Sequence, residues 1–493
     1  MSSSKTFTTT LARPRCDRGP ANVLFAITGN GGSLDSNSGE PPSCQGKVRS
    51  IRAAGGRHGL SWLNFFAAAM QTGFGPFIGV YLTGAGWSQT GIGFALSIGT
   101  VTGLLAQLPA GAVIDHSHHK RGLVAASLVM LAISTAMLAG EPTRGWIWGS
   151  QVLHALASVA IAPAIATITL ALCGHDAYSR WLGVNARFSS MGAATTAALL
   201  GGCATYFSPR EIFLASTMLS VPALAAIFAI RSAGRVKVEH PVLRRLRERP
   251  AQCCDPWTIL RDPVLRVFGA AVLLFHVANA AMLSLALNAL TANARLTSDF
   301  ATKGLGVSDS HIGYVVAGAI FVPQIVVAVA SPGIGAAAQS WGRRPILLAG
   351  FAALPLRGLL FAAMPDGDAL LAIQLLDGVS AAVLGLMVPL IAADATRDNG
   401  NMTLAISSFG LAAGMGAAVS TTLAGSIADW FGMPAAFLAL SAVGALALAV
   451  LFVVMPETRQ TRGLKTSAAV ATVQPDQARS NGGYAAVAFY PKR

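Results

Sequence analysis

Two short stretches decide the fold of this 493-residue chain: Gly111-Ala-Val-Ile-Asp-His-Ser-His-His-Lys-Arg121 and Gly335-Ala-Ala-Ala-Gln-Ser-Trp-Gly-Arg-Arg-Pro345. We call them the first and second signature loops. They begin 224 positions apart, and each follows a long apolar stretch. A loop that occurs twice at a fixed distance indicates an internally duplicated chain.

The duplication extends outward from the two loops. The shift is 224 around the loops and after the fifth span, 212 near the start of each half, and 223 in the fourth and tenth spans. Two halves in the same orientation, joined by a linker, are typical of transporters that bind cargo between the halves. The coinciding pairs include Met191-Gly192 with Met415-Gly416, Phe213 with Phe437, Asn64 with His276, Gln151 with Gln374, and His154 with Asp377.

Composition predicts an all-α membrane protein. Hydrophobic residues make up 53% of the chain and charged residues 11%, which is too little charge to cover a soluble protein of this size. A helix needs about 20 apolar residues to cross a bilayer. The sequence predicts twelve such spans, in two six-helix halves: 59–83, 91–114, 122–140, 146–172, 184–206, 210–231, 264–290, 311–338, 345–363, 368–393, 402–427 and 433–455.

The charge distribution predicts the orientation in the membrane. With both termini in the cytoplasm, thirty Lys and Arg residues fall on the inner side and four on the outer side. This bias is the positive-inside rule, and it accounts for the net charge of +14 without nucleic-acid binding. We therefore expect an integral protein of a bacterial inner membrane that binds no nucleic acid.

The same pattern divides the chain into five parts. We expect a disordered cytoplasmic tail at 1–58, a first half at 59–231, a basic cytoplasmic linker at 232–263, a second half at 264–456 and a cytoplasmic tail at 457–493. The linker is expected to lie near anionic lipid. Residues 1–58 also fit two other interpretations, an organelle transit peptide or a start codon assigned too early.

The signature loops resemble the loop signature of the major facilitator superfamily, Gly-x-x-x-Asp-Arg-x-Gly-Arg-Arg, which occurs once in each half of those transporters. The resemblance covers residues 59–456 and implies two six-helix halves that rock about a central site. Both copies are degenerate, since Gln339 replaces the acid of the second. The first copy keeps Gly111, Asp115 and Lys120, and the second keeps Gly335, Gly342, Arg343 and Arg344.

The first loop contains the candidate gate residue, Asp115. A carboxylate at the inner end of a span can accept hydrogen bonds from a facing helix terminus, and such a contact can close one face of a carrier. Basic residues of the loops could support the gate or could serve only as topological anchors: Lys120, Arg121, Arg343 and Arg344. The His116, His118 and His119 cluster is read as a solvated turn, and no metal site is expected.

Ionisable residues inside spans are the candidate proton or cargo groups, because burying a charge in a bilayer is costly. His154 in span four and Asp377 in span ten are equivalent under the repeat. Gln151 and Gln374 precede them by three residues, so each pair shares a helix face. Asp377 has an alternative role, a purely structural pair with Arg357 of span nine.

Neutral polar residues in spans one and seven are further candidates: Asn64, His276 and Asn279. They could bind cargo or form interhelical hydrogen bonds. Drug–proton antiporters of the superfamily carry a Gly-Pro-rich fifth span. Span five here has no Gly-Pro, which argues against that activity.

The sequence therefore predicts a secondary active transporter of a small molecule, with a proton as one candidate coupling ion. We find neither a nucleotide-binding loop nor a nucleophile elbow, so we expect no ATP-driven transport and no enzyme activity. No cofactor is expected, and the chain is expected to be a monomer. The alternative function is a carrier-fold membrane sensor or scaffold without flux.

Overall fold

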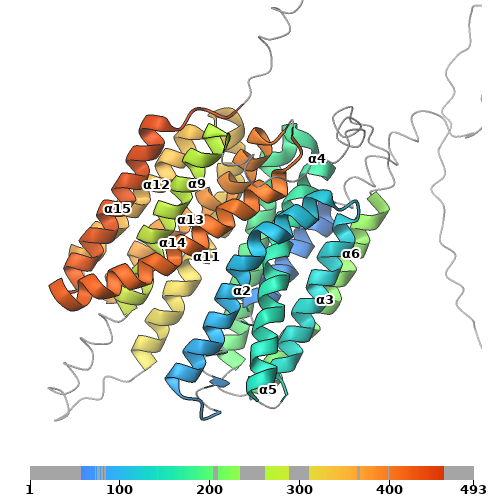
Figure 1. The fold of residues 1–493 in the computed structure, drawn as a ribbon, viewed down its shortest axis with the longest axis horizontal. Helices are drawn as coiled ribbons and strands as arrows, with labels where there is room; N and C mark the ends of the chain where they lie inside the picture. The colour runs from blue at the N-terminus through green and yellow to red at the C-terminus, as the bar shows by residue number, and fades with distance from the viewer. Residues whose placement is uncertain are drawn as a thin grey trace, which may run out of the picture. The chain divides into compact units, whose positions relative to one another are not determined.

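The computed structural model describes residues 57–72, 74, 78, 81–82, 85–140, 143–203, 209–233, 261–287, 310–363, 367–397 and 399–459. Nearly all of the predicted tails 1–58 and 457–493 and of the linker 232–263 lie outside these residues. Within the described residues every regular element is a helix (Figure 1).

The N-terminal half comprises the described residues from 57 to 233. It begins with a helical stretch at 57–72. Five further helices follow: α2 (Gln89–His116), α3 (Lys120–Leu138), α4 (Arg144–Cys203), α5 (Pro209–Met218) and α6 (Ser220–Ala233).

The C-terminal half comprises the described residues from 261 to 459. Asp262 caps its first helix by accepting hydrogen bonds from the Val264 and Leu265 N–H groups, at 2.8 and 3.1 Å. Its helices are α9 (Pro263–Asn279), α11 (Ser310–Ser340), α12 (Arg344–Ala363), α13 (Gly367–Ala395), α14 (Met402–Phe431) and α15 (Met433–Val454).

Ten helical segments of the described residues are long and apolar enough to cross a membrane. One of them, Arg144–Leu199, corresponds to the predicted spans 146–172 and 184–206. Gly174 divides it, with a left-handed φ of 69°. The helix that contains predicted span five begins directly after Gly174, before residue 184, and carries polar residues at its start. The predicted first span, 59–83, lies only partly within the described residues.

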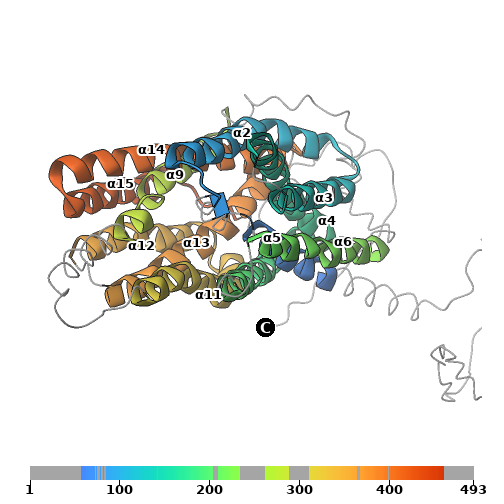
Figure 2. The ribbon, with the colours of Figure 1, turned by 90° about the horizontal axis from the view of Figure 1, so that it is seen from below.

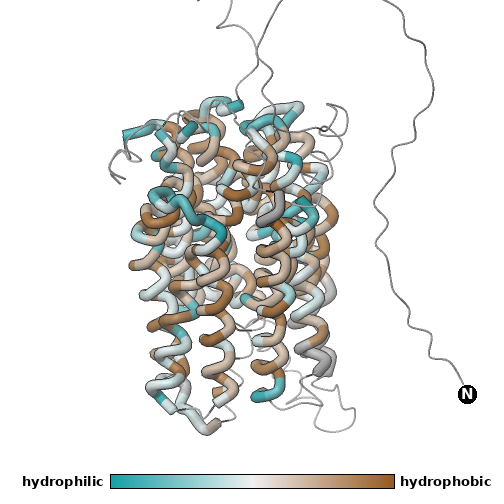
Figure 3. Tube along the Cα trace, turned by 90° about the vertical axis from the view of Figure 1, so that its right-hand side faces the viewer, coloured by the Kyte–Doolittle hydropathy of each residue, from teal (hydrophilic) through white to brown (hydrophobic). Residues whose placement is uncertain are grey.

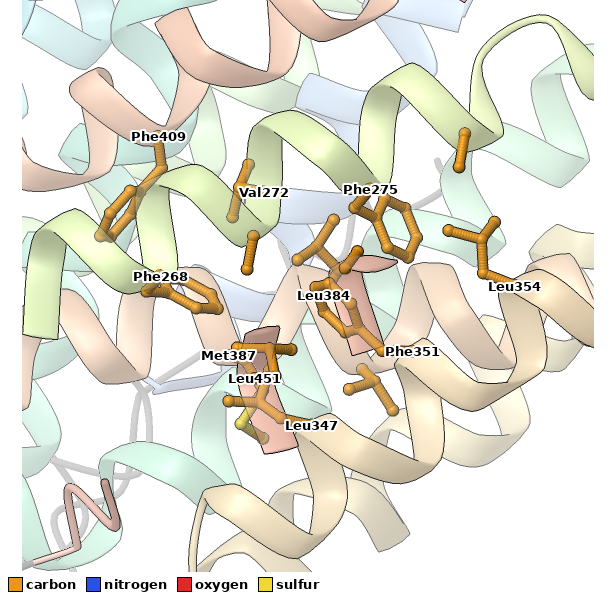
Figure 4. Close-up of a cluster of buried hydrophobic side chains, with 14 of the residues drawn as sticks. Phe268, Val272, Phe275, Leu347, Phe351, Leu354, Leu384, Met387, Phe409 and Leu451 are labelled. Atoms are coloured by element: carbon orange, nitrogen blue, oxygen red, sulfur yellow. The ribbon is translucent and has the colours of Figure 1, made fainter. Parts of the chain in front are cut away.

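Apolar side chains pack the helices of each half together. Phe268 and Phe275 of α9 contact Phe409 and Phe351, with ring centroids 4.9 and 5.0 Å apart (Figure 4). Other large apolar residues remain exposed, such as Leu105 at 74%. Hydrophobic residues extend along the helices, as Figure 3 shows, and this arrangement suits helices that face lipid.

Two pairs of helices make most of the contact between the halves, and α13 and α14 also contact α4. α14 packs on α2, and α11 packs on α4 (Figures 1 and 2). Tyr178 and Leu182 of α4 also belong to the buried cluster of the C-terminal half. Some of these contacts lie at the signature loops, where Gly111 packs on Ser407 and Ser179 bonds Gly335, so the halves touch at this end of the molecule.

Candidate functional site

A buried polar cluster forms around Arg357 in the C-terminal half. One terminal nitrogen, Nη1, donates to Asp377 Oδ1 at 2.6 Å and also to Asn279 Oδ1. The other, Nη2, donates to Gln374 Oε1 at 2.6 Å. Gln374 Nε2 in turn donates to the Ala319 carbonyl at 2.8 Å. Arg357 of α12 therefore bonds residues of α9 and α13, and Gln374 connects this cluster to α11.

This cluster compensates for the burial of the Arg357 charge. The Arg357 side chain is 2% exposed, whereas its partner Asp377 is 19% exposed. An unpaired charge in such a place would cost several kcal/mol, while a paired and hydrogen-bonded one is tolerated. The more exposed carboxylate is the member of the pair that a proton or cargo could reach first.

The equivalent residues of the N-terminal half lack such partners. Gln151 is 5% exposed, and its Nε2 has no hydrogen-bond partner within the described residues. His154 stacks on Phe74 with ring centroids 3.6 Å apart, yet its Nδ1 is also unpaired there. Ser158, four residues farther along α4, has an unpaired hydroxyl as well. These three polar groups lie on one face of α4, and buried polar groups without partners call for an explanation.

The structure separates the remaining polar candidates. Asn279 joins the Arg357 cluster, but Asn64 and His276 bond within their own helices. Asn64 Nδ2 donates to the Leu60 carbonyl at 2.8 Å, and His276 Nδ1 lies 2.9 Å from the Val272 carbonyl. Both bonds span four residues, so the two repeat-equivalent side chains use the same local arrangement.

Asp115 joins the halves at the first signature loop. Its Oδ1 accepts from the Thr403 N–H at 3.0 Å, and its Oδ2 accepts from the Leu404 N–H at 2.7 Å. Both N–H groups belong to the first turn of α14, whose own N-cap residue, Asn401, makes no side-chain capping bond. The first N–H groups of a helix lack internal partners and attract negative charge. Asp115 of α2 therefore caps a helix of the other half.

The neighbouring residues of the first loop support this contact. Gly111 lies against α14, where an added Cβ would come within 2.6 Å of Ser407 Oγ. Lys120 Nζ donates to the Ile114 carbonyl at 2.8 Å and so satisfies the end of α2. Arg121 is partly buried at the start of α3. The three histidines, His116, His118 and His119, are exposed, as expected of a solvated turn.

The second signature loop binds acidic residues of its own half. Arg343 Nε lies 3.1 Å from Asp394 Oδ2 at the end of α13. The Arg343 and Arg344 N–H groups donate to Glu457 at 2.8 and 3.0 Å. Glu457 thereby caps the start of α12. Gly342, with a φ of 103°, allows the tight approach.

Glu457 lies beyond the last span, and its pKa reflects these contacts. Burial alone would raise the pKa of Glu457, but hydrogen bonds from Arg343, Arg459 and Arg344 and the Arg343 charge bring it below the usual 4.5. Sequence reasoning assigned no role to Asp394 or Glu457. The uncapped start of the span after the loop is the signal that could have identified Glu457.

A second contact between the halves was also missed. Ser179 Oγ of α4 donates to the Gly335 carbonyl of the second signature loop. Two turns farther along α4, Arg187 Nε donates to the Ala328 carbonyl of α11 at 2.9 Å. The charge count places Arg187 on the inner side of the membrane, and in the structure it lies within the candidate segment Arg144–Leu199. Its acceptor is a backbone carbonyl, which no sequence pattern marks.

Comparison with known proteins agrees with this architecture. The sequence matches the description Major Facilitator Superfamily over residues 60–292 and 270–489. The chain belongs to this superfamily. Membership makes membrane transport its general activity, and it confirms the all-α fold and the resemblance inferred from the signature loops.

Named relatives and solved structures support the same assignment. Two uncharacterized MFS-type transporters, from two strains of Mycobacterium tuberculosis, are each 34% identical over 407 residues, covering 81% of this chain and 93% of theirs. The crystal structure of the transporter FucP in the outward conformation has a TM-score of 0.59 at 16% identity and covers 82% of this chain and 99% of FucP. The human organic anion transporter TETRAN has a TM-score of 0.53 at 16% identity, with coverage of 84% and 100%.

The structure thus divides the predicted site residues into three groups. Arg357, Asp377, Gln374 and Asn279 form one cluster, while Gln151 and His154 form an unpaired set. Asp115, Gly111 and Gly335 lie between the halves. Within the described residues, no three His, Cys, Asp or Glu side chains are grouped to hold a metal ion. The roles of these residues in gating, proton transfer or cargo binding stay predictions.

Proposed function

We propose that this superfamily member is a secondary active transporter that moves a small polar molecule by alternating access, with a proton as the coupling ion. The observation that carries the proposal is the cap that Asp115 of one half places on α14 of the other. Two hydrogen bonds to a carboxylate hold the halves together at one end. Water can replace both bonds when the halves separate, so the contact is reversible.

The cargo is proposed to bind the unpaired groups of the N-terminal half. Gln151 Nε2 is a donor, and His154 Nδ1 can donate or accept according to its tautomer. Buried polar groups without partners are costly, so a ligand that supplies them gains affinity from their satisfaction. A molecule with hydroxyl, amide or carboxylate oxygens fits these groups, and an apolar molecule does not.

Coupling to protons is proposed to occur at Asp377. The Arg357 guanidinium holds this carboxylate at 2.6 Å, so a proton can bind only as that ion pair weakens. Protonation would free Arg357 to rearrange with Asn279 and Gln374, which belong to α9 and α13. Because those helices come from one half, a proton could bias how that half sits against the other.

The membrane placement completes the proposal. We place the chain in a bacterial inner membrane as a monomer, with both signature loops, the linker 232–263 and both termini in the cytoplasm. The basic linker would then face anionic lipid headgroups. In this orientation, the end at which the halves touch at the signature loops is the cytoplasmic end.

A flux experiment tests the function. The purified chain is reconstituted in proteoliposomes, and uptake and efflux of a panel of polar metabolites and drugs are measured with and without an uncoupler. We expect flux of at least one polar compound that the uncoupler reduces and that Asp377→Asn abolishes. Asp429→Asn, at an exposed site near the end of α14, is the matched control and should retain full flux.

The outcomes separate the proposal from its alternatives. Full flux in Asp377→Asn would disprove proton transfer by this residue while leaving transport intact. No flux of any compound, from a protein that still binds one of them, would instead favour a carrier-fold sensor or scaffold.

A further inference from the structure

Arg187 is a charged residue within a candidate membrane-spanning segment, and it bonds a backbone carbonyl of the other half. It lies in the second helix of α4, within the membrane-spanning segment Arg144–Leu199. Its acceptor, Ala328, lies near the middle of the spanning segment Gly318–Ser340 of α11. An arginine at this depth is costly, so its presence calls for a specific interaction.

The acceptor is unusual because of a proline four residues later. In an α-helix, the Ala328 carbonyl would accept from the N–H of residue 332. Residue 332 is proline, which has no N–H. The Ala328 carbonyl is therefore left without its helical donor. Arg187 Nε, which belongs to the other half, donates to this carbonyl instead, over 2.9 Å. A charged donor makes this hydrogen bond stronger than a neutral one.

The surrounding contacts keep α4 and α11 close together. Ser179, Gly183 and Arg187 are spaced four residues apart, so they lie on one face of α4. Ser179 Oγ bonds the Gly335 carbonyl, and Gly183 lies so close to Ser331 and Pro332 that an added Cβ would clash with their backbone. The Arg187 bond is the innermost of three consecutive contacts between the halves.

We propose that Arg187 is a second gate residue, which latches the closed state by pairing with the carbonyl that Pro332 leaves free. This inference rests on the proposed alternating access. When α4 and α11 separate, the Ala328 carbonyl loses Arg187 and becomes accessible to water. Without Arg187, the closed state buries an unpaired carbonyl and the open state does not, so the equilibrium moves toward opening.

Spin labels at the signature-loop end can measure this equilibrium without knowledge of the cargo. His118→Cys and Asn399→Cys place labels on exposed loops of the two halves, in a full-length chain whose six native cysteines are replaced by serine. Double electron–electron resonance in lipid nanodiscs then gives the ratio of long to short distances. Arg187 is itself exposed, so its replacement leaves no buried cavity.

We expect Arg187→Met to raise the open-to-closed ratio about tenfold, as for loss of a charge-assisted hydrogen bond. Pro332→Ala restores the N–H that the Ala328 carbonyl lacks. In the Pro332→Ala background, Arg187→Met should therefore change the ratio by less than about threefold. Arg187→Gln keeps a donor and should lie between wild type and Arg187→Met. Arg180→Met, on the same helix, is the matched control and should have no effect.

Two results would overturn the latch. One is an unchanged ratio in Arg187→Met while Asp115→Asn, the positive control, opens the protein. The other is an equal effect of Arg187→Met with and without the Pro332→Ala substitution, which would make Arg187 a simple anchor. If every variant, including Asp115→Asn, showed one short distance, alternating access and the latch would both be wrong. If Arg187→Met does not yield a monodisperse protein, Arg187→Gln replaces it, measured with and without Pro332→Ala. The same two results would then overturn the latch.

Discussion

The two halves of this transporter use the same pair of positions in opposite ways. In the C-terminal half, Gln374 and Asp377 are both bonded to Arg357. In the N-terminal half, Gln151 and His154 occupy the equivalent positions, and each has an atom without a partner within the described residues. The two halves differ in the helix that faces this pair of positions, which is α12 in the C-terminal half and α3 in the N-terminal half. A shift of 223 also aligns the buried faces of α3 and α12, and it places Arg357 on Ser134.

Ser134 cannot play the part of Arg357, because its hydroxyl donates to the Leu131 carbonyl of its own helix at 2.8 Å. The polar groups of the C-terminal half therefore bond mainly to one another. In the N-terminal half, Gln151 Nε2 and His154 Nδ1 are buried without a partner within the described residues. The comparison teaches that a duplicated scaffold can pair the polar groups of one half and leave those of the other unpaired. Substitutions in both halves test whether this difference matters for stability and for transport.

The largest effect is expected at Arg357. Arg357→Met should lower the free energy of unfolding by about 3 kcal/mol, because it leaves the Asp377 carboxylate partly buried without its partner. The measurement is unfolding by SDS in mixed micelles, followed by circular dichroism. Arg266→Met, at an exposed site of α9, should cost less than about 0.5 kcal/mol. A loss at Arg357 no greater than at Arg266 would contradict the structural role of the cluster.

The sharpest comparison is between the two glutamines. Gln374→Leu should cost about 1–2 kcal/mol, because it removes bonds to Arg357 and Ala319. Gln151→Leu should be neutral or stabilising, because it removes a buried donor that has no partner within the described residues. The same SDS titration measures both variants. Equal losses at the two positions would show that the halves do not differ.

His154 should separate stability from transport. His154→Phe keeps an aromatic ring against Phe74 and removes the unpaired Nδ1. We expect the unfolding free energy to change by less than about 1 kcal/mol, while flux in proteoliposomes falls at least about tenfold if His154 binds cargo. Wild-type flux in this variant would remove His154 from the site.

The smallest effect is expected at Glu457. This residue binds the second signature loop within its own half, whereas Asp115 of the first loop contacts the other half. Glu457→Gln should cost about 0.5 kcal/mol or less at pH 7, as for other exposed ionic contacts. The pKa of Glu457 is below 4.5, so its contribution is complete at neutral pH and is lost as the pH falls through the lowered pKa. The wild type should therefore lose its advantage over Glu457→Gln only below pH 4.5, in unfolding followed across a pH series.

Local patterns in the sequence were enough for the fold class and for part of the site. Apolar length, charge asymmetry and the signature loops predicted a membrane carrier of this superfamily. They also predicted that Asp115 could meet a facing helix terminus, and the structure places it on α14. For Asp377 the sequence left two interpretations, a proton or cargo group and a structural pair with Arg357. The second arose because both charges are costly inside a bilayer.

The missed residues share a different property. Arg187 bonds a backbone carbonyl 141 positions away, and Glu457 bonds the Arg343 N–H 114 positions away. The partners are main-chain atoms, which every residue has, so no residue type marks them in the sequence. Gly174 was missed for a similar reason, since one glycine with a positive φ replaced the loop expected between spans four and five.

Gly192 and Gly416 have a consequence for how this chain could have evolved from a duplicated ancestor. Gly192 lies directly against the Phe65 backbone, and its repeat mate Gly416 lies against the Leu273 carbonyl. At both crossings main chain touches main chain, so any larger residue would force two helices apart. After duplication, these crossings would have been fixed points around which the polar residues of each copy were free to diverge.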